Sequence, residues 1–325
     1  MKKFIGIDLG TSNTFIYHSS KGIIFSEPSV IAIDIKSTNV MEIGYLAAKM
    51  IGRTPEDIDV IKPILRGVPA RMNPTINLIK EALKRNGIKS LHGYNVLFSN
   101  PCGITPIEKK AMYEIATSLG ANEVFFENQA KLASYGSGTA FKENRGTMHI
   151  NLGAGTTNII VASGDKIIVS KDSIFSGNLL DEAILRYLRK QRHLLVGSKT
   201  AEFIKMKIGS VELTPENRLL EVSGRDILTS LPHNVNISTN EVKNILVPLA
   251  DLLIDSINDA LTLTPPELAS DITESGVVIS GGTSLLAGIR EYIEKSINIP
   301  VRLSPDPVAA VANGMKTYIK TIKIK

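Results

Sequence analysis

Three short loops combine glycine with threonine, serine or asparagine, and each follows an apolar stretch typical of a β-strand. Glycine lets the backbone approach a ligand closely, while loop N–H groups and hydroxyls bind phosphate oxygens. Each loop alone could be an ordinary tight turn, but three in one chain predict nucleotide binding. The loop residues expected to bind nucleotide are Gly10, Thr11, Ser12 and Asn13; Gly153, Ala154, Gly155, Thr156 and Thr157; and Gly281, Gly282, Thr283 and Ser284.

Asp8 ends the first of these strands, where a carboxylate can hold the water shell of a Mg²⁺ ion bound to nucleotide phosphates. Its alternative role is to cap the following turn. The sequence has no G-x-x-x-x-G-K-[ST], and no G-x-G-x-x-G follows the first strand, so the usual nucleotide fingerprints are absent. The five histidines lack zinc-ligand spacing and no G-x-S-x-G occurs, so neither a zinc site nor a hydrolase triad is expected.

The composition is that of an ordinary folded protein, with 43% hydrophobic and 21% charged residues. A net charge of +5 over 325 residues is too small by itself to indicate nucleic-acid binding, although it is compatible with weak attraction to anionic lipid. The single cysteine, Cys102, rules out an intrachain disulfide and favours a reducing compartment. Because no signal peptide or long apolar run is found, we expect a cytoplasmic protein with at most peripheral membrane contact.

The elements that position the loops follow a pattern that occurs twice. A strand at 4–9 leads into the first loop and a hairpin at 14–17 and 22–25, and residues 148–162 repeat this order. The remaining predicted strands lie at 28–35, 95–99, 124–126 and 276–280, and the predicted helices at 76–86, 105–119, 179–192, 200–208, 241–263 and just after 281. Thr105 and Glu108 form a capping box. The repetition, together with the length, predicts two related halves with a cleft.

The three loops resemble, in order and spacing, the two phosphate motifs and the adenosine motif of the actin superfamily. Along essentially its whole length the chain further resembles the bacterial actin family MreB. The segments that carry this closer resemblance are residues 27–34, 51–55, 103–105, 224–226, 231–232 and 264–269.

The resemblance implies an α/β, actin-like fold of two related halves, each with a mixed five-stranded sheet flanked by helices, and a nucleotide cleft between them. The implied subdomains are IA (residues 1–31, 73–141 and 312–325), IB (32–72), IIA (142–179 and 236–311) and IIB (180–235). It also implies that ATP and Mg²⁺ are bound, with Asp8 holding the metal through water and Glu202 and Lys205 flanking ribose and base. A solvated helix face is the alternative for these two side chains.

Two departures from the family bear on hydrolysis. The catalytic residues that the resemblance implies are Asp8, Gln129 and Thr157, and Gln129 stands where the family usually has a water-positioning Glu. The second phosphate loop begins with Asn151, where the family usually has Asp. A glutamine can orient a water molecule but cannot take its proton. We therefore expect a nucleotide-binding protein, with Asn151 among the binding residues, whose ATP hydrolysis is weak or slow.

The resemblance further implies antiparallel double filaments on the inner face of the cytoplasmic membrane that govern cell shape, or movement in a wall-less cell. The expected partners are the chain itself, paralogous bacterial actins and the membrane, with no nucleic acid. The loop at 87–94 falls about where family members carry a membrane-inserting loop, with Leu91 and Tyr94 as its contacts; an ordinary connection is the alternative. The lysine-rich segment 315–325 could lie among lipid headgroups or begin as a helix packed on the first half. A soluble small-molecule kinase, or another non-polymerising ATP-binding protein of the superfamily, is the alternative function.

Overall fold

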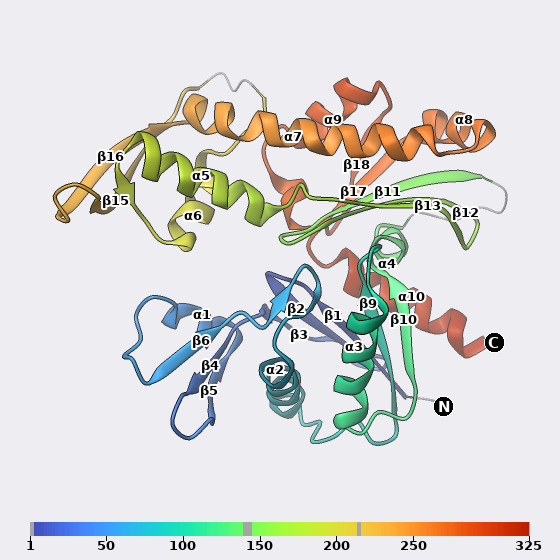
Figure 1. The fold of residues 1–325 in the computed structure, drawn as a ribbon. Helices are drawn as coiled ribbons and strands as arrows, with labels where there is room; N and C mark the ends of the chain where they lie inside the picture. Colours follow the sequence, from blue (N-terminus) through green and yellow to red (C-terminus); the bar gives the residue numbers. More distant parts are fainter. Residues whose placement is uncertain (1–2, 139–144, 213–215, 325) are drawn as a thin grey trace. The chain divides into compact units, whose positions relative to one another are not determined.

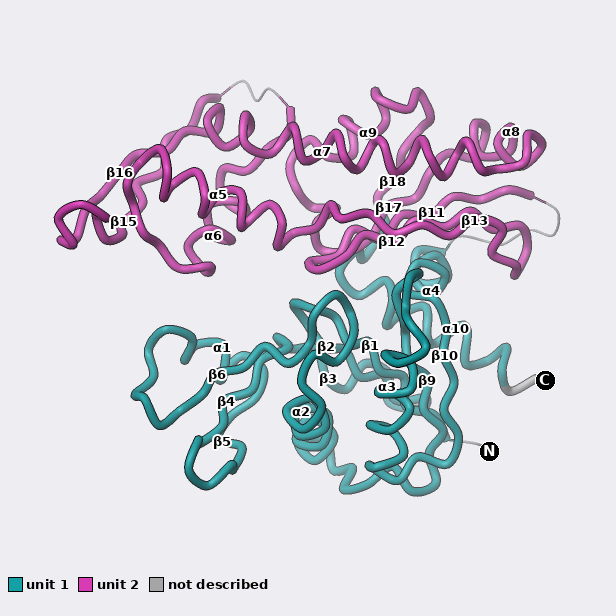
Figure 2. The backbone as a smooth tube through the Cα atoms, viewed as in Figure 1, with its two compact units in different colours: residues 1–140, 304–325 teal, residues 141–303 magenta. Residues whose placement is uncertain are grey.

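The structure is a computed structural model that describes residues 3–138, 145–212 and 216–324, with side chains up to residue 322. The chain divides into two compact units, residues 1–140 with 304–325 and residues 141–303 (Figures 1 and 2). Each unit has a five-stranded sheet and an apolar core of its own. The expectation of two mixed five-stranded sheets flanked by helices is therefore confirmed, whereas the division into four subdomains stays a prediction.

The sheet of unit 1 has the strand order β10-β9-β1-β2-β3. Its strands are β1 (Lys3–Leu9), β2 (Asn13–His18), β3 (Gly22–Pro28), β9 (Tyr94–Asn100) and β10 (Val124–Asn128). The central strand β1 pairs antiparallel with β2 and parallel with β9. Phe4 to Leu9 are all buried, because helices cover both faces of this sheet.

Unit 2 repeats the plan with the order β13-β12-β11-β17-β18. Its strands are β11 (Gly146–Leu152), β12 (Thr157–Ser163), β13 (Lys166–Ser173), β17 (Val277–Ser280) and β18 (Val301–Leu303). The central strand β11 again pairs antiparallel with the strand that follows it and parallel with a strand from much later in the chain. The predicted repeat of strand, glycine loop and hairpin is thus confirmed in both units.

Four helices of unit 1 pack on opposite faces of its five-stranded sheet: α2 (Met72–Arg85), α3 (Pro106–Ser118), α4 (Gln129–Gly136) and α10 (Ala310–Ile324). The short helix α1 (Gly44–Met50) packs apart from them, against Val30 and Ala32. Apolar residues of α2 and α3 share a core with Ile5 and Ile7, while α4 and α10 contribute to a second cluster around Phe4. The predicted capping box at the start of α3 is confirmed. Alternate residues of β1 therefore face the two helical layers.

The C-terminal helix α10 belongs to unit 1, as predicted. Met315 and Ile319 are buried in the cluster around Phe4. Gly314 allows α10 to cross α4 closely, because a Cβ there would collide with the carbonyl oxygen of Leu132. Because Gln129 is the first residue of α4, the packing of α4 on α10 also helps to position Gln129.

The remaining elements of the two units include short strands and the long helix α7. In unit 1 they are β4 (Ile31–Asp34), β5 (Val40–Ile43), β6 (Ile58–Ile61), β7 (Ile64–Leu65) and β8 (Val68–Pro69); in unit 2 they are β14 (Leu194–Leu195), β15 (Leu219–Asp226), β16 (Pro232–Ser238), α5 (Gly177–Gln191), α6 (Ser198–Ile208), α7 (Thr239–Thr262), α8 (Pro266–Ser275), η1 (Gly282–Leu285) and α9 (Ile289–Ile297). The strand predicted at 28–35 is present only as β4, and the helix predicted after 281 is the single 3-10 turn η1. Among the described residues, no helix is long and apolar enough to cross a lipid bilayer.

Candidate functional site

The first two predicted loops are built alike. The strand pairs Leu9–Thr14 and Leu152–Thr157 close turns over residues 10–13 and 153–156. A Cβ on Gly10 would collide with the carbonyl oxygen of Asn13, and a Cβ on Gly153 would lie 2.6 Å from the carbonyl oxygen of Thr156. Both turns therefore require glycine, and they form the close-packed backbone cradles that phosphate binding needs.

Residues outside the first loop hold it in place through side-chain and backbone hydrogen bonds. Ser29 donates from Oγ to the carbonyl oxygen of Gly10 at 2.6 Å, and from its backbone N to Ser12 at 2.8 Å. The backbone N of Gly67, in the turn between β7 and β8, donates to Thr11 Oγ1 at 3.1 Å. Sequence reasoning missed Ser29 and Gly67. The Arg66-Gly67 pair between two apolar dipeptides was the available hairpin signal, and both residues have positive φ.

Asp8 and Gln129, two of the residues that the resemblance implies are catalytic, lie together although 121 positions separate them. Asp8 Oδ1 accepts hydrogen bonds from Ser99 Oγ at 2.5 Å and from Gln129 Nε2 at 2.9 Å. Burial raises the pKa of Asp8, and these two hydrogen bonds oppose the rise. Gln129 is the first residue of α4, whose N-cap Asn128 accepts from two backbone N–H groups.

This arrangement fits a hydrated magnesium ion on a nucleotide. With Oδ1 engaged by Ser99 and Gln129, the carboxylate of Asp8 can offer Oδ2 to a metal-bound water. Because Gln129 donates its Nε2 to Asp8, the orientation of its amide is fixed, as positioning a water would require. Among the described residues, no cluster of three or more His, Cys, Asp or Glu side chains could cage a metal without such water.

Unit 2 has a similar serine contact at the end of its central strand, but with the amide of Asn151 in place of the carboxylate of Asp8. Asn151 is aligned with Ser280 across β11 and β17, and Ser280 Oγ donates to Asn151 Oδ1 at 3.0 Å. In unit 1, Ser99 makes the same contact with Asp8. His149 Nε2 lies 2.9 Å from Ser280 Oγ, and burial lowers the pKa of His149 to about 3, so its ring is neutral.

The second and third loops meet at Gly177, the first residue of α5. Gly177 N and Thr283 Oγ1 both donate to the carbonyl oxygen of Gly153, at 3.1 and 2.9 Å. Lys205 Nζ donates to the Gly177 carbonyl oxygen at 2.9 Å and pairs with Asp181 at 2.8 Å. A Cβ on Gly177 would lie 2.9 Å from Thr283 Oγ1, so glycine is needed here. Sequence reasoning missed Gly177; a glycine two positions before the helix predicted at 179–192 was the available signal.

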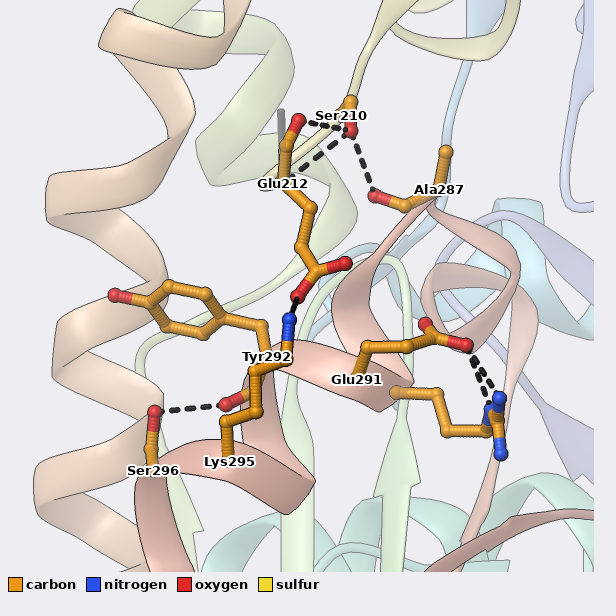
Figure 3. Close-up of polar contacts among 8 residues, drawn as sticks. Ser210, Glu212, Ala287, Glu291, Tyr292, Lys295 and Ser296 are labelled. Atoms are coloured by element: carbon orange, nitrogen blue, oxygen red, sulfur yellow. Dashed lines mark hydrogen bonds and ion pairs between the residues drawn. The ribbon is translucent and has the colours of Figure 1, made fainter. Parts of the chain in front are cut away.

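The segments that carry the third loop and Lys205 are also tied together farther along the chain (Figure 3). Ser210, just after α6, donates from Oγ to the Glu212 carbonyl oxygen at 2.9 Å and bridges to Ala287. Lys295 of α9 pairs with the carboxylate of Glu212 at 2.5 Å, and this contact raises the pKa of Lys295. Tyr292, beside it on α9, bonds to Asp251 of α7. The contacts of Ser210 and Glu212 connect the end of α6 to the region following η1, and the Tyr292 contact joins α9 to α7.

Two other predicted site residues take different places. Thr157 was predicted to be catalytic, but its side chain is fully buried and its Oγ1 donates to the Phe175 carbonyl oxygen at 2.7 Å. This hydrogen bond anchors the end of the loop, and the catalytic role of Thr157 stays a prediction. Glu202 is exposed on α6, whereas Lys205, one turn later, is mostly buried by its contacts with Gly177 and Asp181.

The prediction that Leu91 contacts a membrane is wrong in this structure. Leu91 has no exposed surface, because it packs into the core beneath α2 and α3, and its backbone N donates to Leu119. Tyr94 is half-buried, with its ring set edge-on against His18. The segment between α2 and β9 therefore turns Leu91 toward the core, as an ordinary connecting loop does.

Comparisons with known proteins agree with this geometry. The family model described as MreB/Mbl protein matches residues 2–325. The cell shape-determining protein Mbl of Bacillus cereus is 36% identical over 98% of this chain and 96% of its own length, and MreB of Escherichia coli K12 is 36% identical over 97% and 94%. The crystal structure of MreB 5 of Spiroplasma citri bound to AMPPNP covers 100% of this chain and 98% of its own, at 34% identity and a TM-score of 0.95.

The family match spans nearly all of the chain, and each curated relative exceeds 30% identity over almost its full length. The solved structure shares the arrangement of two mixed five-stranded sheets described above. The chain therefore belongs to the MreB/Mbl family of bacterial actins.

Proposed function

We propose that this chain binds Mg-ATP and polymerises into membrane-associated filaments that determine cell shape or, in a wall-less cell, movement, and that it hydrolyses ATP slowly. The observation that carries the proposal is the pair of glycine turns placed directly after Asp8 and Asn151 on equivalent central strands. Two relatives bear the description cell shape-determining protein, and the relative from Spiroplasma citri has been crystallised with AMPPNP and with ADP.

The binding residues divide by chemistry. Asp8 would hold a magnesium-bound water, a role that suits a buried carboxylate with one engaged oxygen. The two glycine turns would supply close backbone for the phosphates, and the third loop, which contacts Gly153 through Thr283, would face the nucleoside together with Lys205. Bound Mg²⁺ would neutralise phosphate charge that develops during hydrolysis.

Slow hydrolysis follows from Gln129. Its amide is oriented by Asp8 and can position a water molecule, but it has no basic oxygen that takes up the water's proton. Phosphoryl transfer depends mainly on positioning and on charge stabilisation, so losing a base slows the step without abolishing it. Nucleotide binding and release, with rare hydrolysis, would then control the filament.

The decisive experiment is high-speed sedimentation across a protein concentration series, with Mg-ATP, with Mg-ADP and without nucleotide. The proposal expects pelleting above a critical concentration that shifts with the nucleotide. Isothermal titration calorimetry with Mg-ATP on the same preparation measures binding separately. Binding without pelleting under any condition would reject autonomous polymerisation and favour a soluble ATP-binding enzyme or a chain that needs a copolymerising partner.

A further inference from the structure

Three buried polar side chains form a chain of hydrogen bonds at the centre of the unit 2 sheet. His149 and Asn151 lie on β11, and Ser280 ends the neighbouring parallel strand β17. Ser280 Oγ is 2.9 Å from His149 Nε2 and 3.0 Å from Asn151 Oδ1. Less than a tenth of each side chain is exposed. Buried hydrogen bonds of this kind fix the orientation of the groups they join.

The direction of these hydrogen bonds follows from His149. The neutral ring carries one hydrogen, on either Nδ1 or Nε2. Nδ1 is buried and has no hydrogen-bond partner, and an unpaired N–H would be the costlier choice there. The hydrogen therefore sits on Nε2 and is donated to Ser280 Oγ. The hydroxyl of Ser280 is then left to donate to Asn151 Oδ1.

This direction decides which end of the Asn151 amide is available. Because Oδ1 is the accepting end, Nδ2 points away from Ser280 as a donor. No described residue accepts a hydrogen bond from Nδ2, and Nδ2 is not one of the buried unpaired atoms, so it reaches the surface of the site. In unit 1, Asp8 has two carboxylate oxygens at the equivalent position and can only accept. The two strand ends therefore differ in hydrogen-bonding character.

We infer that Asn151 donates a hydrogen bond from Nδ2 to a phosphate oxygen of the nucleotide, and that His149 and Ser280 are positioning residues that hold its amide in this orientation. The inference rests on the proposed ATP binding. An aspartate here, as is usual in the family, would accept from a metal-bound water and repel phosphate oxygens. This chain should therefore bind ATP with less dependence on Mg²⁺ than its N151D variant.

The first test measures ATP affinity by isothermal titration calorimetry, in excess Mg²⁺ and in EDTA. Asn151→Asp is expected to weaken binding of metal-free ATP about 10-fold, because a donor is replaced by a negative charge. In Mg²⁺ the loss should be under threefold. An equal loss in both conditions, or no loss in EDTA, would overturn the assigned role of Asn151.

The second test separates positioning from mere structural support. Ser280→Ala should weaken ATP binding about fivefold, because the amide of Asn151 is no longer held. In the N151D background the same change should cost less than twofold, since a carboxylate has two equivalent oxygens and needs no such orientation. Equal losses in both backgrounds would show that Ser280 supports only the fold. Ser256→Ala is the matched control, because it removes another hydroxyl pair of unit 2, with Ser173.

A third measurement needs no variant. Nitrogen-15 NMR of the histidine side chains should show His149 neutral, protonated on Nε2 and unresponsive to pH between 6 and 8. His149→Gln keeps a donor and should retain ATP affinity within about twofold. A hydrogen on Nδ1 would reverse the chain of hydrogen bonds and overturn the inference. If the unaltered protein bound no ATP, the proposed function would fail, while the spectrum would still test the orientation itself.

Discussion

Asp8 is a carboxylate held in a place that favours its neutral form. Its ordinary pKa near 3.8 is raised by burial, so the folded protein holds a proton on Asp8 more tightly than the unfolded chain does. As the pH rises, the unfolded chain therefore loses this proton at a lower pH than the folded protein does. Above the ordinary pKa, ionisation favours the unfolded state, so the contribution of Asp8 to the free energy of unfolding decreases. A bound magnesium ion is the natural compensation for such a buried charge.

Asp8→Asn is therefore expected to stabilise the fold while weakening Mg-ATP binding. The amide keeps an acceptor for Ser99 and Gln129 but removes the buried charge. The melting temperature at pH 8 should rise by roughly 2–4 °C, as about 1 kcal/mol gives in a domain of 150–250 residues. Differential scanning calorimetry should show this difference shrinking as the pH is lowered toward the ordinary pKa of Asp8, because the folded protein takes up the proton before the unfolded chain does. A lower melting temperature at pH 8 would contradict the reasoning.

Gln129→Glu should accelerate phosphate release about 10-fold or more, because a carboxylate can take the proton of the attacking water. Its neighbour Asp8 is buried 2.9 Å from the present amide nitrogen, so like-charge repulsion would raise the pKa of the new carboxyl. The rate should consequently increase with pH through the neutral range. A phosphate-release assay checks this, with Gln129→Ala as the control that should not accelerate. An unchanged rate would remove Gln129 from the hydrolytic step.

At the level of elements, the second glycine loop links a hairpin to two other segments. Gly153 turns the chain between β11 and β12, and its carbonyl oxygen accepts from Gly177 and Thr283. The loop is therefore defined by contacts with α5 and η1 as much as by its own turn. A change at Gly153 should disturb both neighbours.

Gly153→Ala is expected to lower ATP affinity at least 10-fold, because the new methyl group would lie 2.6 Å from the Thr156 carbonyl oxygen. Overpacking of this kind typically costs 1–3 kcal/mol of stability. Gly197→Ala is the matched control, since a Cβ there meets no atom within 4 Å. Calorimetric titration with Mg-ATP and thermal melting compare the two variants. Similar affinities would mean that the turn tolerates a side chain.

For the whole molecule, the structure changes which segment is the better candidate for membrane contact. Leu91 lies in the core, whereas Lys316 and Lys320 are exposed on α10, whose Met315 and Ile319 anchor it to unit 1. An anchored helix with exposed lysines can attract anionic lipid without unfolding. Lysines near an anionic surface contribute about 1 kcal/mol each.

Lys316→Gln combined with Lys320→Gln should accordingly weaken binding to phosphatidylserine vesicles about 30-fold, the ratio that corresponds to about 2 kcal/mol. Lys36→Gln with Lys62→Gln removes the same charge from exposed positions of unit 1 and should have a much smaller effect. Vesicle co-sedimentation at low salt measures both pairs. Equal losses for the two pairs would indicate a general charge effect, and no loss for either would exclude α10.

The sequence by itself determined the elements whose signals are local. Glycine loops after apolar strands, the capping box at Thr105 and the periodicity of α7 were all predicted correctly, because each depends on residues a few positions apart. Placing Asp8 beside Gln129 required the family resemblance as well, since the two residues are far apart in the chain. Leu91 was misplaced because an isolated leucine in a polar loop carries no sign of which side it faces.

Only the tertiary structure decided how the strand ends are completed. Ser99 reaches Asp8 across 91 positions, and Ser280 reaches Asn151 across 129, because parallel strands align residues from distant parts of the chain. Gly177 and the buried hydroxyl of Thr157 likewise acquire their roles from segments that meet only in the folded unit. Sequence spacing fixes which residues can form a turn, whereas strand pairing and burial determine which side chains face it and what charge they can hold there.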